Sequence, residues 1–168
     1  MVHHAVALPV SEDGREVLLA CHTEGTNYGA LLPPSGKVKP TDRNAQAAAV
    51  RETREELGID LDDPRCVGVV EVLKEDGDWL RLFVFVSRYR GKPRKSNEMR
   101  DARLFPIDDL PLEDMWPDAS SWVPHVINHG HDAPPLGFRL RHVRGPNGRP
   151  GFLVKRFNPA ALVRRYCA

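Results

Sequence analysis

Apolar runs in the first half of the chain predict β-strands. VHHAVALPV (residues 2–10) and REVLLACH (residues 15–22) are rich in strand-forming residues, and the polar turn SEDG lies between them. CVGVVEVLK (residues 66–74) and WLRLFVFVS (residues 79–87) form a second pair, separated by EDGD, which is a clear hairpin signal. The pattern therefore predicts one pair of strands near the N-terminus and another in the middle of the chain.

Residues 44–57 carry the clearest helical pattern of the chain. Thr41, Asp42 and Asn44 all offer N-caps, and helix-forming alanines follow them. Gly58 stands where a helix commonly ends in a left-handed residue. The sequence therefore predicts a helix from Asn44 to Leu57.

Shorter elements are expected on either side of this helix. Residues 33–36 (PPSG) are expected to form a loop, and ARLFPI (residues 102–107) a short strand. A second helix is predicted to begin near Ser120, with Pro124 in its first turn, where proline is tolerated.

The end of the chain predicts a further hairpin and a short helix. LGFRLRHV (residues 136–143) and GFLVKRF (residues 151–157) flank the turn sequence RGPNGRP, and NPAALVRRY (residues 158–166) has a helical composition. Strands and helices in this order favour a mixed sheet sandwiched by helices, which places the fold in the α/β or α+β class.

Composition favours one folded domain over residues 1–168. Hydrophobic residues make up 41% of the chain and charged residues 28%, an ordinary globular balance. The formal net charge of +1 gives no overall attraction to nucleic-acid polymers or anionic membranes. No apolar run approaches the roughly 20 residues of a membrane span. We therefore expect neither kind of partner.

The cysteines and the N-terminus favour the cytoplasm. MVHHAVALPV lacks the basic start and apolar core of a secretory signal. Cys21, Cys66 and Cys167 are few, odd in number and widely spaced. Such cysteines are typical of buried or incidental thiols in a reducing compartment, not of a disulfide framework or a zinc site. Whether the protein is a monomer or a dimer is left undetermined.

Three carboxylates converge on one face of the predicted helix. Glu52, Glu55 and Glu56 stand at positions i, i+3 and i+4, a spacing at which like charges repel unless a cation lies among them. Carboxylate oxygens without nearby Cys or His select Mg²⁺, or Mn²⁺, rather than zinc. Arg51 and Arg54 could partly offset the repulsion. The alternative is a solvated, charged helix face.

RETREELGI (residues 51–59), preceded by SGKV (residues 35–38), resembles the signature motif of the Nudix hydrolases, with Thr53 at a usually aliphatic position. The resemblance implies an α/β/α sandwich with a mixed β-sheet. It also implies divalent metal ions that bridge the diphosphate of a nucleotide substrate.

The resemblance assigns roles to the residues of this motif. Glu52, Glu55 and Glu56 would be the metal ligands, with Glu55 or Glu56 as a candidate catalytic base. Arg51 would orient and brace these carboxylates, and Gly36, at the glycine turn, would belong to the metal site.

The first half of the motif departs from the family pattern. The family has a glutamate where this chain has Asp42, and one extra residue separates Asp42 from Arg51. Because aspartate is the shorter side chain, we expect weaker support of the metal site, but not its loss.

A second resemblance lies outside this motif. NEMR (residues 97–100) and DMWPDASSW (residues 114–122) resemble the MutT-like members of the family that hydrolyse oxidised purine nucleoside triphosphates such as 8-oxo-dGTP. It implies that Glu98 is a further metal ligand or the general base, that Trp116 stacks on a purine, and that Asp118 bonds its edge. The alternatives are an exposed loop glutamate and a core tryptophan.

Two differences between the expected base pocket and these relatives remove a polar side chain. Leu32 replaces an asparagine, and Ala119 replaces the second of two aspartates. Lys37, after the glycine turn, could touch a phosphate or be a solvated loop residue. His3 and His4 could border the pocket, but histidines so near a terminus are expected on the surface.

The resulting expectation is a Mg²⁺-dependent nucleoside triphosphate pyrophosphohydrolase that releases a monophosphate and pyrophosphate. Its partner would be a small nucleotide, and oxidised purine nucleotides would be the substrates. Two alternatives remain open: hydrolysis of another nucleoside diphosphate-X compound, and a non-catalytic nucleotide-binding domain. The resemblance does not extend to the C-terminal extension, about residues 131–168.

Overall fold

The computed structural model describes residues 1–74, 76–130, 132–144 and 150–168. Within these residues the strands are β1 (Val2–Val10), β2 (Glu16–His22), β3 (Leu31–Leu32), β4 (Ser35–Lys37), β5 (Asp60–Leu61), β6 (Arg65–Leu73), β7 (Trp79–Arg90), β8 (Met99–Pro106), β9 (Leu136–Arg144) and β10 (Pro150–Phe157). The helices are α1 (Ala45–Leu57), α2 (Ala119–Ile127) and α3 (Ala160–Tyr166), with 3-10 turns at Gly25–Asn27 and Leu112–Asp114.

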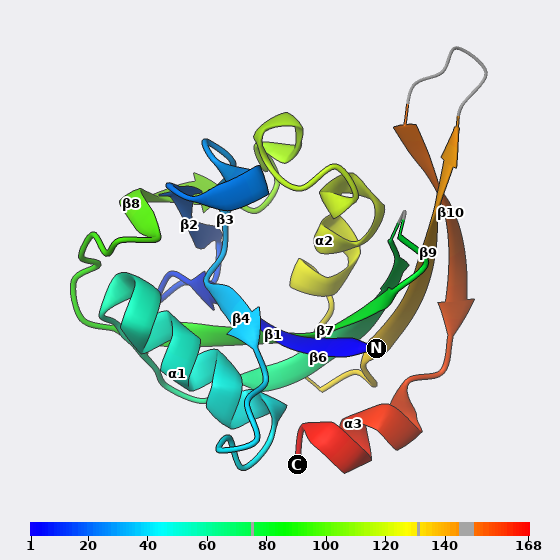
Figure 1. Cartoon of the computed structure of the whole chain (residues 1–168). Helices are drawn as coiled ribbons and strands as arrows, with labels where there is room; N and C mark the ends of the chain where they lie inside the picture. The colour runs from blue at the N-terminus through cyan, green and yellow to red at the C-terminus, as the bar shows by residue number, and fades with distance from the viewer. Residues whose placement is uncertain (75, 131, 145–149) are drawn as a thin grey trace.

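The strands form a mixed sheet, as the sequence predicts (Figure 1). The order is β10-β9-β6-β7-β1-β2-β3, with β4 beside β1 and β8 beside β2. β6 and β7 are the predicted antiparallel hairpin. By contrast, β1 runs parallel to β7 along its whole length, and β9 runs parallel to β6.

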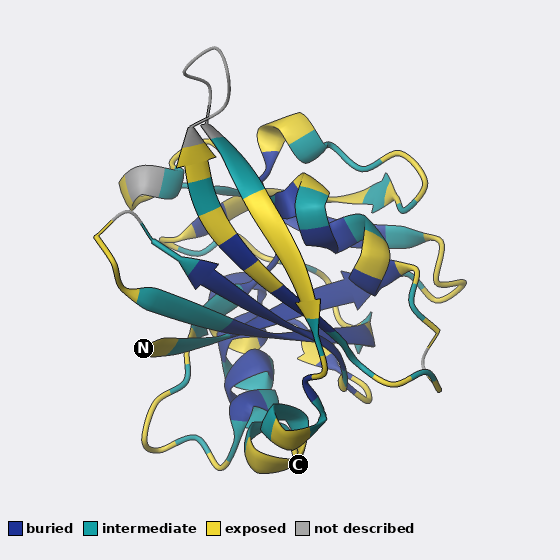
Figure 2. Cartoon of the chain, turned by 90° about the vertical axis from the view of Figure 1, so that its right-hand side faces the viewer, coloured by how far each residue is buried: buried dark blue, intermediate teal, exposed yellow. Residues whose placement is uncertain are grey.

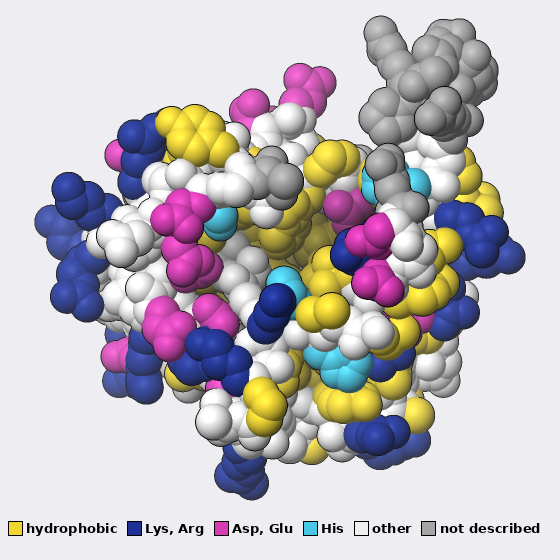
Figure 3. Space-filling model, in the orientation of Figure 1, with side chains coloured by type: hydrophobic (Ala, Val, Ile, Leu, Met, Phe, Trp, Pro, Cys, Tyr) yellow, Lys and Arg dark blue, Asp and Glu magenta, His cyan; other side chains and the backbone are white. Residues whose placement is uncertain are grey.

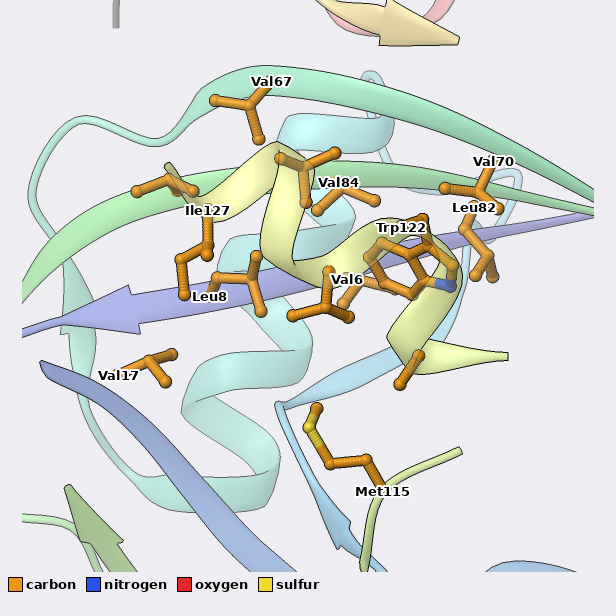
Figure 4. Close-up of a cluster of buried hydrophobic side chains, with 14 of the residues drawn as sticks. Val6, Leu8, Val17, Val67, Val70, Leu82, Val84, Met115, Trp122 and Ile127 are labelled. Atoms are coloured by element: carbon orange, nitrogen blue, oxygen red, sulfur yellow. The ribbon is translucent and has the colours of Figure 1, made fainter. Parts of the chain in front are cut away.

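Helices cover both faces of this sheet (Figure 1). Ala48 and Ala49 of α1 are buried against Ala5 of β1, and their small side chains let the helix lie close to the strand. On the other face, Trp122 of α2 is fully buried in a cluster with Leu82 (Figure 4). The burial pattern in Figure 2 places the core between the layers. The predicted α/β/α sandwich, of the α+β class, is confirmed.

The caps of α1 agree with the prediction. Asn44 is the N-cap, and its side chain accepts a hydrogen bond from the backbone N–H of Ala47. Gly58 ends the helix in the left-handed conformation, with φ of 66°, which glycine adopts without steric cost.

Two local predictions were wrong. Residues 33–36 are not all loop, because Ser35–Lys37 form β4, which pairs with β1 and sets Gly36 opposite Ala5. The run is too short, and too rich in Pro and Gly, to show a strand pattern. Pro124 lies in the second turn of α2, because this helix begins at Ala119. The chain tolerates the missing N–H inside this short helix.

The C-terminal segment belongs to the same sheet. β10 pairs antiparallel with β9, as predicted, although the turn at residues 145–149 lies outside the described residues. α3 forms where the sequence predicts it, on the same side of the sheet as α1 (Figure 1). No helix in the described part of the chain is long and apolar enough to cross a membrane.

A buried carboxylate joins this segment to the rest of the sheet. Glu71 of β6 accepts hydrogen bonds from Arg81 of β7 and from Arg139 of β9, both at 2.6 Å, and its side chain is 3% exposed. Burial raises the pKa of Glu71, but the bonds from the two arginines outweigh burial and leave the pKa below its ordinary value of 4.5.

We predict that Glu71→Ala lowers the free energy of unfolding by about 3 kcal/mol, because it leaves the mostly buried guanidinium of Arg81 unpaired. Arg139→Ala should cost less, since Arg139 is half exposed and Arg81 still pairs with Glu71. Urea unfolding followed by circular dichroism measures both. The wild-type advantage over Glu71→Ala should be present above pH 4.5 and disappear as the pH falls through the lowered pKa. Equal losses in the two variants would contradict this account.

Candidate active site

The site begins at a contact between β4 and α1. Gly36 of β4 lies directly against the side chain of Glu52, so that a Cβ atom at position 36 would overlap the carboxyl group. Glu52 is buried on the face of α1 that meets β4. A glycine is therefore required here for the helix and its carboxylate to approach the strand.

Arg51 holds the acidic residues of the site together. Its Nη1 donates to Glu52 at 2.6 Å and to Glu55 at 3.1 Å. Its Nε and Nη2 donate to the two oxygens of Asp42 at 2.9 and 2.8 Å, and Nη2 also donates to the carbonyl of Lys37 at 3.0 Å. The guanidinium thus connects β4, the loop before α1 and the acidic face of the helix.

Asp42 is bonded to the arginine that contacts the glutamates of α1. It forms a two-point ion pair with Arg51, and its side chain is only 6% exposed. The backbone N–H of Lys39 also donates to it at 2.7 Å. The hydrogen bond from Arg51 outweighs burial and holds the pKa of Asp42 below its usual range. The extra residue in the loop before α1 therefore does not keep the shorter side chain from Arg51, and weaker support of a metal ion stays a prediction.

Among the glutamates of α1, Glu56 has the environment least favourable to a negative charge. It is 3% exposed, and burial raises its pKa to about 8, although the backbone N–H of Ser35 donates to it at 2.9 Å and favours the charged form. The neighbouring charges of Glu52, Glu98 and Glu55 add to the upward shift. Several carboxylates therefore compete for one small region, as expected of a site that holds a cation.

The donors of this region fit a hard divalent cation in their chemistry. They are carboxylate oxygens, which Mg²⁺ and Mn²⁺ prefer. Among the described residues, however, no three of these side chains are already gathered around one point. Arg51 engages Glu52 and Glu55, while the N–H of Ser35 engages Glu56. Cation binding would need these carboxylates to turn from their present partners.

A pocket of about 280 Å³ opens beside the carboxylates. It is lined by His4, Val6, His22, Asn27, Ser35, Glu56, Val72, Leu80, Leu82, Glu98, Trp116 and Asp118. In the space-filling view, acidic side chains gather beside a recess whose inner wall is hydrophobic (Figure 3). The structure therefore places the predicted Glu56 and Glu98 in one pocket with the predicted Trp116 and Asp118.

Trp116 and Asp118 form one wall of the pocket. Trp116 is partly buried and stacks on the core residue Trp122, with ring centroids 6.2 Å apart. The indole N–H of Trp122 donates to Asp118 at 2.8 Å, which fixes the carboxyl group. Burial raises the pKa of Asp118 despite this bond, which increases the share of its neutral form. A neutral carboxyl group can both donate to and accept from a flat polar ligand.

Glu98 stands at the start of β8 and is exposed as well as pocket-lining. The backbone N–H of Thr23 donates to its carbonyl at 2.9 Å, which ties the loop before β8 to the end of β2. Its negative charge adds to the upward shift of the pKa of Glu56.

Leu32 and Lys37 lie outside the lining of this pocket. Leu32 is 1% exposed and packs in a cluster with Leu57 and Met99, against which Trp116 also packs. Lys37 is exposed on β4, and its positive charge acts on His4. A direct contact of either residue with a substrate stays a prediction.

His4, which the sequence left between the pocket border and the surface, lines the pocket. It is half-buried, and burial followed by the charge of Lys37 lowers its pKa, so the imidazole is neutral at pH 7. The expectation of a surface position is wrong for His4. The alternation of β1 was the available signal, because it puts His4 on the same face as Val6. His3 points to the other face, where its ring lies 4.8 Å from that of Tyr166.

A wider depression of about 760 Å³ runs along another side of α1 and includes Arg51 and Glu55. Its lining has neither Glu56 nor an aromatic side chain. The narrower pocket is the better candidate, because it combines acidic, aromatic and hydrogen-bonding groups.

Comparison with known proteins gives one family. The model of the NUDIX domain matches residues 1–126. An oxidized purine nucleoside triphosphate hydrolase from Danio rerio is 34% identical over 121 residues, which cover 70% of this chain and 75% of that protein.

Solved structures agree with this comparison. A MutT NUDIX hydrolase from Burkholderia pseudomallei is 26% identical with a TM-score of 0.58, covering 66% of this chain and 86% of that one. A mutator MutT protein from Bacillus halodurans reaches a TM-score of 0.69 at 21% identity and covers 92% of this chain and 98% of that one, which supports the fold over nearly the whole chain.

The raised pKa of Glu56 leads to a stability prediction. A folded-state pKa of about 8, above the ordinary 4.5, means that stability present below pH 4.5 is lost as the pH rises to 8. In metal-free buffer at pH 9, Glu56→Gln should therefore unfold with a free energy about 2 kcal/mol higher than wild type.

The matched control is Glu55→Gln, since Glu55 is exposed and its replacement should change stability by less than about 0.5 kcal/mol. Urea unfolding at pH 4 and pH 9 measures the difference. A Glu56→Gln variant with the same pH dependence as wild type would contradict the burial of a costly charge.

Proposed function

The chain belongs to the Nudix family of hydrolases, and we propose that it cleaves nucleoside triphosphates, oxidised purine nucleotides in particular, into monophosphate and pyrophosphate. The observation that carries this proposal is a single pocket with an aromatic and hydrogen-bonding wall and an acidic rim, Trp116 and Asp118 facing Glu56 and Glu98. Such a pocket suits a flat base at one end and phosphates at the other.

The acidic rim would hold divalent cations, with Mg²⁺ as the expected ion and Mn²⁺ as a substitute. Glu52, Glu55, Glu56 and Glu98 are the ligands proposed, with the glycine turn at Gly36 beside them. When bound, such cations neutralise phosphate charge and lower the pKa of water. Bound cations would also relieve the repulsion that raises the pKa of Glu56.

The proton of the attacking water would pass to a carboxylate. Water attacks an internal phosphorus of the triphosphate, and Glu55, Glu56 or Glu98 accepts its proton. Glu56 and Glu98 both line the pocket, and a pKa near neutrality suits Glu56 for taking and returning a proton. Arg51 does not touch the pocket lining; it orients Glu52 and Glu55 from behind.

The base end would recognise a purine by stacking and by edge contacts. Trp116 offers a flat face, and Asp118 offers a carboxyl group that can donate or accept. Neutral His4, on β1, would supply one further donor and one acceptor. The pocket of about 280 Å³ has room for a base, and the phosphates would then lie at the acidic rim.

A second candidate substrate class is favoured by the apolar residues behind the base end. Leu32 and Ala119 are almost fully buried, so neither offers a polar group to an oxidised purine. Hydrolysis of another nucleoside diphosphate-X compound, with the same acidic residues, is the alternative. The cytoplasm, where nucleotide pools occur, is the compartment we propose.

Replacing both Glu55 and Glu56 by glutamine should reduce Mg²⁺-dependent pyrophosphate release by at least about 1,000-fold, because two of the proposed ligands and bases are lost. The assay is a panel of normal and oxidised nucleoside triphosphates with ADP-ribose included. Glu12→Gln, at an exposed position in the turn between β1 and β2 and outside the pocket lining, is the matched control and should keep full activity.

Circular dichroism should show that the double variant is folded. Full activity in the folded double variant would refute the proposed chemistry. A strong preference of the wild type for ADP-ribose would instead favour the alternative substrate class.

Asp118→Asn should raise the KM for 8-oxo-dGTP by about tenfold or more, while the kcat changes less, because a base contact is lost at a distance from the phosphates. Asp114→Asn, an exposed change in the same segment, should leave both constants unaltered. Steady-state kinetics on both variants would decide; an unchanged KM in Asp118→Asn would exclude Asp118 from base recognition.

A further inference from the structure

The C-terminal helix is lightly attached to the rest of the protein. None of the seven residues of α3, all of them described, is fully buried. Leu162, Val163, Tyr166 and the following Cys167 pack only partly against the cluster beneath the sheet. In Figure 1, α3 lies near the start of the chain at the open end of this layer.

Two cysteines meet at this attachment. The Sγ of Cys167 lies 3.3 Å from the Sγ of Cys66 on β6, and the thiol of Cys66 faces the carbonyl of Gly68 at 3.7 Å. Both side chains are partly exposed. Since an S–S bond is about 2.0 Å long, the two sulfurs need to approach by roughly 1.3 Å to join. The third cysteine, Cys21, is on β2 and faces the carbonyl of His22.

We propose that Cys66 and Cys167 form a reversible redox pair whose disulfide fastens the C-terminal helix to the sheet. The oxidant is a low-molecular-weight disulfide such as oxidised glutathione. One cysteine thiolate attacks it and releases one glutathione thiolate; the second cysteine attacks the mixed disulfide and releases the other. The protein loses two electrons and two protons, and two glutathione thiols form.

The geometry gives the two cysteines different parts in this exchange. Cys167 donates its S–H to Cys66, and this bond together with burial raises the pKa of Cys167. A thiol that stays protonated is a poor first nucleophile. Cys66 therefore reacts first with the oxidant, and Cys167, already beside it, resolves the mixed disulfide.

The pair is connected to the first turn of α1. Asn44 donates from Nδ2 to the carbonyl of Ala168, the residue after Cys167, at 2.9 Å. The same side chain caps α1 by accepting from the N–H of Ala47. A disulfide that immobilises Cys167 thus also restrains the cap of the helix that carries the acidic residues. This inference does not depend on which substrate the protein cleaves.

The test begins with folded wild-type protein incubated with oxidised glutathione and then alkylated. Mass spectrometry should show the loss of two hydrogen atoms, one peptide link between Cys66 and Cys167, and an alkylated Cys21. Dithiothreitol should reverse the change. Because the bond closes a loop spanning 101 positions, it should raise the thermal unfolding midpoint by about 5 °C or more.

Single variants separate the two roles. Cys167→Ser should lose the link and accumulate a glutathione adduct on Cys66, whereas Cys21→Ser, the matched control, should form the link like wild type. Hydrogen exchange should slow in oxidised wild type at residues 45–48 and 160–168, but not in Cys167→Ser.

Three results would overturn the proposal. They are separate glutathione adducts on Cys66 and Cys167 without a link, a link that involves Cys21, and a Cys66–Cys167 link that changes neither the midpoint nor the exchange. None of these measurements depends on pyrophosphate release. A failure to form the disulfide can therefore be distinguished from a failure of the proposed hydrolase activity.

Discussion

Arg51 is the residue on which the acidic site depends. Three glutamates on one helical face, with Glu98 nearby, would repel one another and the helix would be costly to form. The planar guanidinium offers five donors in a fixed fork, and here it bonds Asp42 on one side and Glu52 with Glu55 on the other. The same guanidinium donates to the carbonyl of Lys37. The group that offsets the negative charge of α1 therefore also ties the helix to β4.

The sheet adds the second half of the site. Because β1 runs parallel to β7 and carries β4 on its other edge, His4 and the Ser35 N–H come to the same pocket wall as Leu82. The segment before α2 then closes the pocket, held by the bond from Trp122 to Asp118. Residues far apart in the chain thus meet because these two strand pairings and the packing of α2 bring them to one pocket.

Local patterns were enough to predict part of this arrangement. The helical pattern put Glu52, Glu55 and Glu56 on α1, and the caps of α1 followed from Asn44 and Gly58. Features set by long-range pairing were missed. Nothing local shows that Ser35–Lys37 form a strand, or that the parallel neighbour of β1 makes His4 part of a pocket. Motif spacing likewise could not show that a longer loop lets Asp42 reach Arg51.

The two departures at the base end act through packing. Leu32 packs in the cluster that supports Trp116, and Ala119 is fully buried at the start of α2. A polar side chain at either buried position would need a hydrogen-bond partner inside the protein, or the pocket wall would have to move so that the side chain reached the ligand. With apolar residues there, polar recognition of a base under the proposed function would fall to the groups that do line the pocket, chiefly Asp118 and His4. Base preference should therefore depend on the protonation of these two groups, which burial shifts in both cases towards the neutral form. In their neutral forms the two groups would present donors and acceptors without net charge, so that they could distinguish bases by the pattern of their edges, while a charged triphosphate would be bound at the acidic rim.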